Sequence, residues 1–333
     1  MIPMSNKLRW GVLGVAKIAT VKVIPAMQRG TLTEIAAIAS RDLAKAENAA
    51  RELGIPKAYG SYEDLIADPA IDAIYNPLPN HLHVPWSVKA AEAGKHVLCE
   101  KPIALTIGET NELIAARDRT GVKIGEAFMV HVHPQWLRTL EIVRSGEIGD
   151  LRAFNCVFSY NNRDPHNIRN IAEIGGGTLM DIGCYPIHTS RWIFGEEPRK
   201  VSALIDRDPA FGTDRLVSAI LDYPSGQATF LCSTQMTPFQ RMTFYGTAGR
   251  VEVEIPVNAP PDKETRIFVQ TTELRTETFP VCDQYTLQGD AFSRAILGQG
   301  DVPVPLENAL KNMAVIDALF RSARSGSWEA PLA

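Results

Sequence analysis

The feature that most constrains the fold is an alternation of apolar strands and amphipathic helices along residues 8–127. Segments with apolar residues at helical spacing separate six short apolar runs, at residues 8–14, 33–40, 57–59, 72–75, 96–99 and 122–127. Parallel strands buried on both faces have this composition, and helices connect them by right-handed crossovers. The alternation predicts an α/β fold in which residues 1–127 form a doubly wound parallel sheet, the Rossmann arrangement.

The first strand-to-helix turn has the character of a dinucleotide-binding turn. It contains Gly14, Ala16, Lys17 and Ile18 and ends in Ala19, an imperfect G-x-G-x-x-G/A pattern with Ala16 in place of the middle glycine. A helix N-terminus after such a turn binds a pyrophosphate through its free backbone N–H groups. The first four of these residues are therefore predicted to contact a dinucleotide, although an ordinary strand-to-helix turn has the same local features.

The end of the second strand indicates which dinucleotide is preferred. Sites that prefer NAD usually place Asp or Glu there, whereas this strand ends in Ser40 and Arg41. A guanidinium can form a forked contact with a 2′-phosphate, and a serine hydroxyl can add a hydrogen bond. The prediction is NADP, with NAD as a possible second cofactor. An exposed arginine at a helix start is the alternative explanation.

Two further turns lie at the same predicted edge of the sheet. Asn80 and His83 follow the fourth strand, where a nicotinamide ribose would lie, and are candidates for orienting the cofactor. Glu100, Lys101 and Pro102 follow the fifth strand and place two charged groups at the edge where open α/β sheets bind ligands. A proline-rich connection and a solvated loop pair would explain the same residues without a function.

The second half of the chain has a different pattern. Residues 128–333 read as an α+β domain built on a large, mainly antiparallel sheet, because paired strand patterns flank turns such as those at 224–226 and 247–249. One face of such a sheet packs on helices, and the other needs a cover. A second subunit is the simplest cover, so we expect a homodimer or homotetramer assembled through this sheet.

The chemical centre of this half is a glycine-rich segment that opens a helix. Three glycines at residues 175–177 lead into Asp181, Tyr185 and His188, which are spaced i, i+4 and i+7 and so share one helical face. A carboxylate, a phenol and an imidazole are costly to bury unless they line a wet or reactive pocket. Arg169 stands just before the glycines. A polar surface face of the helix is the alternative.

Composition excludes several classes of protein. The net charge of −4 argues against a nucleic-acid-binding surface, and no apolar run reaches the length of a membrane span. The five cysteines are scattered and odd in number, which fits free thiols in a reducing compartment and predicts a cytoplasmic protein. The histidines lack the partners of a common metal motif, so no metal site is predicted.

Together these motifs resemble the glucose–fructose oxidoreductase / inositol dehydrogenase family of NAD(P)-dependent oxidoreductases. The likeness covers essentially the whole chain and depends on the Rossmann turn, the E-K-P sequence after the fifth strand and the G-G-G-x-x-x-D-x-G segment. Tyr185, four residues after Asp181, resembles the subgroup with NADP-dependent D-xylose dehydrogenases and dihydrodiol dehydrogenases. The chain departs from many relatives at His131, where they carry Arg.

The resemblance implies that Lys101 and Tyr185 are the catalytic pair. A phenol with a pKa near 10 is a poor base at neutral pH, and a nearby ammonium would lower that pKa. Lys101 would also contact cofactor and substrate, together with Glu100 on the cofactor side. Asp181, Arg169 and His188 would contact a sugar, with Asp181 also orienting the pair.

The reaction implied is NADP-dependent oxidation of C1 of an aldopyranose, such as D-xylose or D-glucose, to the aldonolactone. A keto-sugar reductase or a trans-dihydrodiol dehydrogenase would use the same residues. The resemblance also extends to a non-catalytic NADP sensor, although a sensor has no need of both Lys101 and Tyr185.

Overall fold

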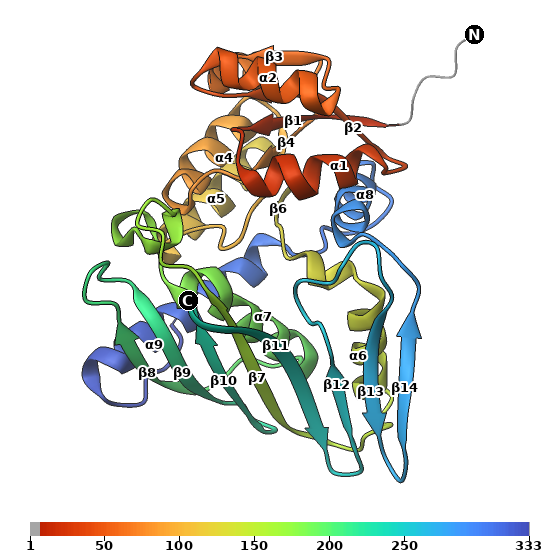
Figure 1. Cartoon of the computed structure of the whole chain (residues 1–333), viewed down its shortest axis with the longest axis vertical. Helices are drawn as coiled ribbons and strands as arrows, with labels where there is room; N and C mark the ends of the chain where they lie inside the picture. Colours follow the sequence, from red (N-terminus) through yellow and green to blue (C-terminus); the bar gives the residue numbers. More distant parts are fainter. Residues whose placement is uncertain (1–6, 333) are drawn as a thin grey trace. The chain divides into compact units, whose positions relative to one another are not determined.

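The computed structural model describes residues 7–332, which form two compact units. Unit 1 comprises the chain up to Val132 together with Asp283–Ala309, and unit 2 comprises His133–Cys282 and the chain from Leu310. Each unit has its own sheet (Figure 1). No described helix is both long enough and apolar enough to cross a membrane.

The sheet of unit 1 is six-stranded and entirely parallel, with the order β3-β2-β1-β4-β5-β6. The strand order reverses between β1 and β4, which is the switch point where open α/β sheets bind ligands. The strands are β1 (Leu8–Leu13), β2 (Thr33–Ala39), β3 (Lys57–Tyr59), β4 (Ala73–Asn76), β5 (His96–Cys99) and β6 (Ile124–Glu126). The predicted doubly wound sheet is confirmed.

Helices connect these strands, and local caps define where several of them begin. Ser61 accepts a hydrogen bond from the Asp64 amide at 3.0 Å, and Thr106 accepts one from the Glu109 amide at 3.1 Å, as N-cap residues do. The helices of unit 1 are α1 (Ile24–Gln28), α2 (Leu43–Leu53), α3 (Tyr62–Ala67), α4 (His83–Glu92), α5 (Ile107–Thr120) and α8 (Gln284–Ile296).

Unit 2 contains an eight-stranded, mainly antiparallel sheet with the order β14-β13-β12-β11-β7-β10-β9-β8, in which only β7 and β10 pair in parallel. The predicted fold class is confirmed. The strands are β7 (Leu151–Asn161), β8 (Lys200–Arg207), β9 (Asp214–Asp222), β10 (Gln227–Ser233), β11 (Gln235–Gly246), β12 (Arg250–Val253), β13 (Thr265–Gln270) and β14 (Leu274–Phe279). Of these, β8 was not anticipated from the sequence.

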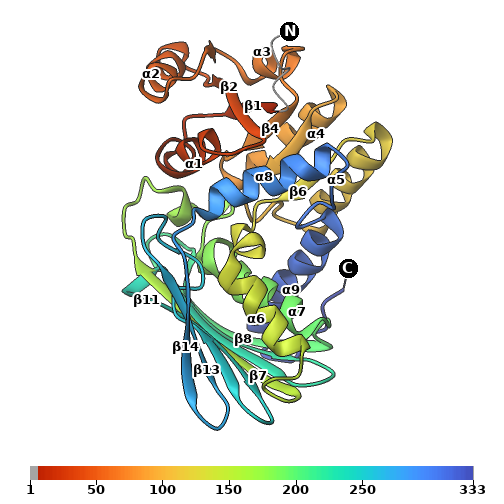
Figure 2. The ribbon, with the colours of Figure 1, turned by 90° about the vertical axis from the view of Figure 1, so that its right-hand side faces the viewer.

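Helices cover one face of this sheet (Figure 2). They are α6 (Pro134–Arg144), α7 (Cys184–Phe194) and α9 (Leu306–Ser325). α6 packs against β12 and β13, and α7 packs against β7. Side chains alternate along the strands, so that Val217, Ala219 and Leu221 of β9 are buried while Ile220 between them is exposed. The sheet therefore has one packed face and one open face.

Each unit combines two separate stretches of the chain, whereas a single boundary between residues 127 and 128 was predicted. Helix α8 belongs to unit 1 because Asp290 accepts hydrogen bonds from the amides of Thr31 and Leu32, at 3.0 and 2.9 Å. Gly289 allows the close approach, since a Cβ there would lie 2.9 Å from the Met27 side chain. The division into residues 1–127 and 128–333 stays a prediction about functional domains.

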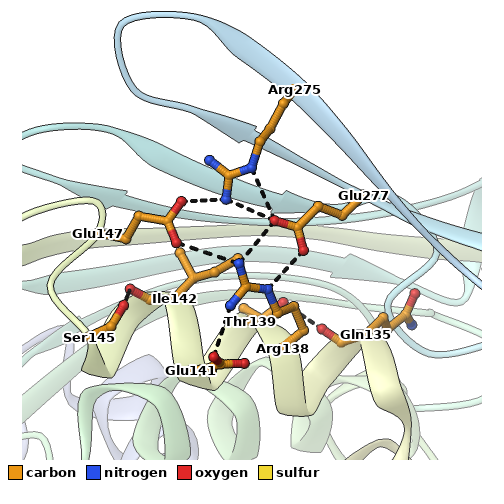
Figure 3. Close-up of polar contacts among 9 residues, drawn as sticks. All are labelled: Gln135, Arg138, Thr139, Glu141, Ile142, Ser145, Glu147, Arg275 and Glu277. Atoms are coloured by element: carbon orange, nitrogen blue, oxygen red, sulfur yellow. Dashed lines mark hydrogen bonds and ion pairs between the residues drawn. The ribbon is translucent and has the colours of Figure 1, made fainter.

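A cluster of ion pairs links the edge strand β14 to helix α6 and the turn after it (Figure 3). Arg138 contacts Glu277 through Nε at 2.8 Å and Glu141 through Nη1 at 3.1 Å. Arg275 contacts both Glu277 and Glu147. Hydrogen bonds from Arg138 hold the pKa of Glu277 below its usual value. Because these side chains are partly exposed, each ion pair alone contributes little to the free energy of unfolding. The network as a whole contributes more, because it links the edge strand β14 to α6.

Candidate active site

The first strand-to-helix turn has the geometry of a dinucleotide-binding turn. Gly14 has a φ of 83°, and its N–H donates to the Ala39 carbonyl at 2.8 Å, which fixes the turn against the end of β2. A Cβ at this position would lie 2.9 Å from the Leu78 side chain. Helical backbone follows at once, and the Ala16 carbonyl accepts from the Thr20 amide at 3.0 Å. The turn thus leaves a helix N-terminus at the switch point, as a pyrophosphate requires.

Part of the helix after this turn is π-helical, over Ala19–Val23. Within the turn, the Lys17 side chain is exposed and Ile18 is partly buried. Single π-turns occur frequently at functional sites. Direct contacts from Gly14, Ala16, Lys17 and Ile18 to a cofactor stay a prediction.

Ser40 and Arg41 lie just past the carboxyl end of β2. The Ser40 amide donates to the Tyr59 carbonyl at 3.0 Å, and the Ser40 hydroxyl accepts from the Asp42 amide at 3.2 Å. Asp42 in turn caps helix α2. Arg41 is exposed between them, so its guanidinium can reach a ligand at this edge.

The structure buries His83 between two backbone turns. Asn80 opens a short 3₁₀ turn, Asn80–Leu82, whereas His83 is fully buried at the start of α4. Its Nδ1 lies 2.8 Å from the Pro102 carbonyl and its Nε2 lies 2.7 Å from the Leu78 carbonyl. Both ring nitrogens thus face the backbone of the two turns that follow β4 and β5. His83 therefore links these turns, and the cofactor contacts of Asn80 and His83 stay predictions.

The Lys101 turn is held on both sides by buried groups. The Tyr75 hydroxyl donates to Glu100 Oε1 at 2.7 Å, and the Lys101 amide lies 3.3 Å from Glu100 Oε2. On the other side, the Ile103 amide donates to Glu126 Oε1 at 2.9 Å. Burial, followed by the Glu100 charge, raises the pKa of Tyr75 well above its usual value, so this phenol remains a donor. The contacts fix the backbone of Lys101 at the carboxyl end of β5.

In unit 2, the local backbone requires glycine at positions 176 and 177. A Cβ at Gly176 would lie 2.6 Å from the Ile171 carbonyl oxygen and 2.7 Å from that of Arg169. Gly177 has a φ of 121°, which other residues rarely adopt. A π-helical segment, Leu179–Gly183, follows and continues into α7. Asp181 therefore lies in a wide turn directly before Tyr185.

Asp181 is held by two cationic or phenolic partners. Its Oδ2 accepts from the Tyr160 hydroxyl at 2.5 Å and pairs with Arg169 Nε at 2.9 Å. The Asp181 charge raises the pKa of Arg169, and burial together with that charge raises the pKa of Tyr160. The contact of Tyr160 with Asp181 was not predicted from the sequence. Asp181 thus acts as an acceptor in this cluster and not as a free base.

Tyr185 and His188 lie in the first two turns of α7. The Tyr185 ring packs against Phe158 at a centroid distance of 6.1 Å, and its backbone carbonyl accepts from the Thr189 hydroxyl at 2.8 Å. His188 is fully buried, with Trp192 one turn further along at 6.3 Å. The pairing of Tyr185 with Lys101 and the substrate contacts of Arg169, Asp181 and His188 stay predictions. Among residues 7–332, no cluster of side chains could hold a metal ion.

The two buried histidines of the chain with strongly lowered pKa values predict a sensitivity to acid. Burial lowers the pKa of His83 and of His133, which caps helix α6, to about 4 from 6.5. Both therefore fold in the neutral form, and their stabilising contribution is present above pH 6.5 and lost as pH falls toward 4. We expect the free energy of unfolding to decrease over this range by up to about 1.4 kcal/mol per pH unit for each histidine.

Urea unfolding of the wild type and of His133→Asn at pH 7.5, 6.0 and 5.0 measures this contribution. Asp214, whose pKa burial raises to about 6, acts in the opposite sense between pH 4 and 6, so only the difference between the two proteins isolates the histidine. The variant should show the weaker loss of stability on acidification. Equal pH dependence in both proteins would contradict the expectation.

Comparison with known proteins agrees with this geometry. Residues 8–128 match the oxidoreductase family with an NAD-binding Rossmann fold, and residues 136–252 match the GFO/IDH/MocA C-terminal domain. The chain therefore belongs to the GFO/IDH/MocA family of oxidoreductases. The predicted family, the enzyme class and the nicotinamide cofactor are confirmed.

Individual relatives match over nearly their whole length. An uncharacterized oxidoreductase of Rhizobium meliloti is 48% identical over 97% of this chain and 98% of that protein. D-xylose 1-dehydrogenase (NADP(+)) 2 of Haloferax volcanii is 39% identical over 96% of this chain and 98% of its own. The structure of a 3-ketoreductase of Actinomadura kijaniata in complex with NADP and TDP-benzene has a TM-score of 0.89 and 28% identity, covering 95% of this chain and 98% of the other.

Proposed function

We propose that the protein is an NADP-dependent sugar dehydrogenase acting on C1 of an aldopyranose such as D-xylose or D-glucose. The observation that supports the proposal is that the segments carrying both predicted catalytic residues are fixed by hydrogen bonds and an ion pair. Glu100 and Glu126 fix the turn that carries Lys101, and the cluster around Asp181 anchors the helix that carries Tyr185. Residues so held suit reactions that require fixed geometry. The relative named D-xylose 1-dehydrogenase (NADP(+)) 2 supports the choice of substrate.

The residues divide the reaction between them. The nicotinamide, when bound, supplies the acceptor for the hydride that leaves C1. Tyr185 takes the proton from the C1 hydroxyl, so that a C=O bond forms and the product is the aldonolactone. Lys101 favours the phenolate of Tyr185 and stabilises the negative charge that develops on the substrate oxygen. Asp181, held by Arg169, accepts a hydrogen bond from a sugar hydroxyl.

The cofactor we propose is NADP rather than NAD. Arg41 is exposed at the edge where the adenosine ribose of a Rossmann-bound dinucleotide lies, and Ser40 stands next to it. Ser40 and Arg41 follow β2 where sites that prefer NAD usually carry Asp or Glu, and the Asp42 carboxylate beside them caps α2.

A second candidate is the reduction of the ketone of a keto sugar to a hydroxyl, with Tyr185 as the proton donor. The likeness to a 3-ketoreductase crystallised with NADP and TDP-benzene favours it. A trans-dihydrodiol dehydrogenase would use the same residues, and a non-catalytic NADP sensor is the least supported reading.

Initial rates of NADPH formation across aldoses, inositols and dihydrodiols, with NADP⁺ and NAD⁺ compared, test the proposal. We expect the strongest signal with one pentose or hexose and NADP⁺. Silence across the panel, with NADP⁺ still binding, would reject the sugar dehydrogenase. Oxidation of NADPH by a keto sugar in the same preparation would then identify the reductase.

We also propose that the open face of the unit 2 sheet forms the interface of a homodimer or homotetramer. Leu204, Ile220 and Tyr245 are exposed there by the alternation of strand side chains, at 79%, 42% and 40%. Light scattering on eluted protein should give a multiple of the chain mass, and Ile220→Arg should lower it. A monomeric wild type would contradict the interface.

The free cysteines, four of them buried, suit a reducing compartment such as the cytoplasm, which cell fractionation would test.

A further inference from the structure

Asp214 is a buried carboxylate that neither the sequence patterns nor the proposed reaction uses. It is the first residue of β9, 1% exposed, and its Oδ2 accepts a hydrogen bond from the Leu179 amide at 2.6 Å. Leu179 is the first residue of the π-helical segment that continues into α7. A carboxylate from a distant strand thus binds the N-terminus of the helix that carries Asp181 and Tyr185.

The local sequence does not supply this cap. Thr178 stands at the N-cap position, but its side chain caps no helical amide. Its hydroxyl instead lies 3.1 Å from the Thr234 hydroxyl and accepts from the Thr234 amide at 3.2 Å. An uncapped first turn would leave donors unsatisfied in a buried region, which is costly. Asp214 satisfies one of them and places its negative charge at the positive end of the helix.

The Asp214 carboxylate occupies the space that a side chain at position 177 would need. A Cβ at Gly177 would lie 2.0 Å from Asp214 Oδ1, a separation no side chain could tolerate. The last glycine of the glycine-rich segment is therefore required both by its backbone φ of 121° and by the presence of Asp214. Residues 177–179 and Asp214 therefore depend on one another: glycine at 177 leaves room for the carboxylate, and the carboxylate binds the Leu179 amide.

We propose that Asp214 is a positioning residue for the reaction, which fixes the wide turn before Tyr185. Turns of this kind are rare, and an ordinary α-helical turn is the usual alternative. Shortening the wide turn by one residue would rotate the preceding residues by about 100° relative to α7. Asp214 holds the first turn from one side, and Arg169 and Tyr160 hold Asp181 from the other. Together they keep Asp181 and Tyr185 in one fixed relation.

This inference rests on the proposed role of Tyr185, and Asp214→Ala tests it beside Asp214→Asn. Asn keeps an oxygen that can accept from the Leu179 amide, whereas Ala removes it. We expect Asp214→Ala to lower kcat about ten-fold or more while leaving the KM for NADP⁺ unchanged, because misplaced groups slow the chemical step. Asp214→Asn should restore kcat to within about three-fold of the wild type.

Asp208→Asn is the matched control. Asp208 lies on the same β8–β9 connection and accepts from the Ala210 and Phe211 amides, at 2.8 and 3.0 Å, but contacts no part of α7 in these bonds. It should leave kcat unchanged. If Asp214→Ala does not fold, Asp214→Ser, another shortened side chain, takes its place in the kcat and exchange measurements with the same expected results.

Amide hydrogen exchange separates this inference from the proposed function. Exchange at Leu179 should be faster in Asp214→Ala than in the wild type, whatever the substrate. Wild-type kcat in folded Asp214→Ala, or unchanged exchange at Leu179, would overturn the positioning role. An active Tyr185→Phe would instead overturn the proposed function and leave the exchange result standing.

Discussion

Replacing Tyr185 with Phe, or Lys101 with Ala, is expected to lower kcat by about 10²–10⁴-fold. Phe lacks the hydroxyl that takes the proton from the substrate, and Ala lacks the ammonium that favours the phenolate. Neither change should unfold the protein, because Phe keeps the ring packing against Phe158 and the Lys101 turn is held through its backbone. Steady-state rates with saturating NADP⁺ and sugar measure the effect.

Two variants of the same residue types serve as controls. Tyr223→Phe removes a buried hydroxyl that contacts Ser190 at 2.8 Å, and Lys89→Ala removes an ammonium that pairs with Glu63. Both should keep kcat within a few-fold of the wild type. Near-normal kcat in Tyr185→Phe and Lys101→Ala together would reject the catalytic pair.

Replacing Arg41 with Ala is expected to reduce the preference for NADP⁺ over NAD⁺ by about ten- to hundred-fold. The estimate corresponds to loss of one charge-assisted contact with a 2′-phosphate, worth roughly 1.5–3 kcal/mol. The loss should fall on the KM for NADP⁺, since the 2′-phosphate takes no part in the transfer of hydride or proton. The ratio of kcat/KM values for the two cofactors measures it.

Arg51→Ala is the control for this change, because Arg51 is another exposed arginine, in the last turn of α2. Its cofactor preference should equal that of the wild type. An unchanged preference in Arg41→Ala would mean that other residues at this edge select the cofactor.

Much of the fold could be predicted because its signals are local. Apolar runs and helical spacing predicted all six strands of the parallel sheet. Hairpins in the second half were likewise predicted from turn residues. The missed strand β8 has a weak pattern, because the residues at its ends, Lys200, Asp206 and Arg207, are exposed charges and Leu204 is an exposed apolar residue.

The rest of the candidate site depends on contacts between residues far apart in the chain. Tyr160 meets Asp181 across 21 positions, and Asp214 meets Leu179 across 35. Neither tyrosine nor aspartate carries a local signal for such a partner. The carbonyls beside the two ring nitrogens of His83 likewise belong to two separate turns, and its place after β4 gave no signal for them.

Deuterium transfer from C1 of D-[1-²H]xylose or D-[1-²H]glucose to NADP⁺ tests the central claim most directly. We predict NADPH that carries deuterium at C4 of the nicotinamide, formed by the wild type and lost in Tyr185→Phe. Unlabelled NADPH from a labelled substrate, or no transfer from either sugar by protein that binds NADP⁺, would contradict oxidation at C1 of an aldopyranose.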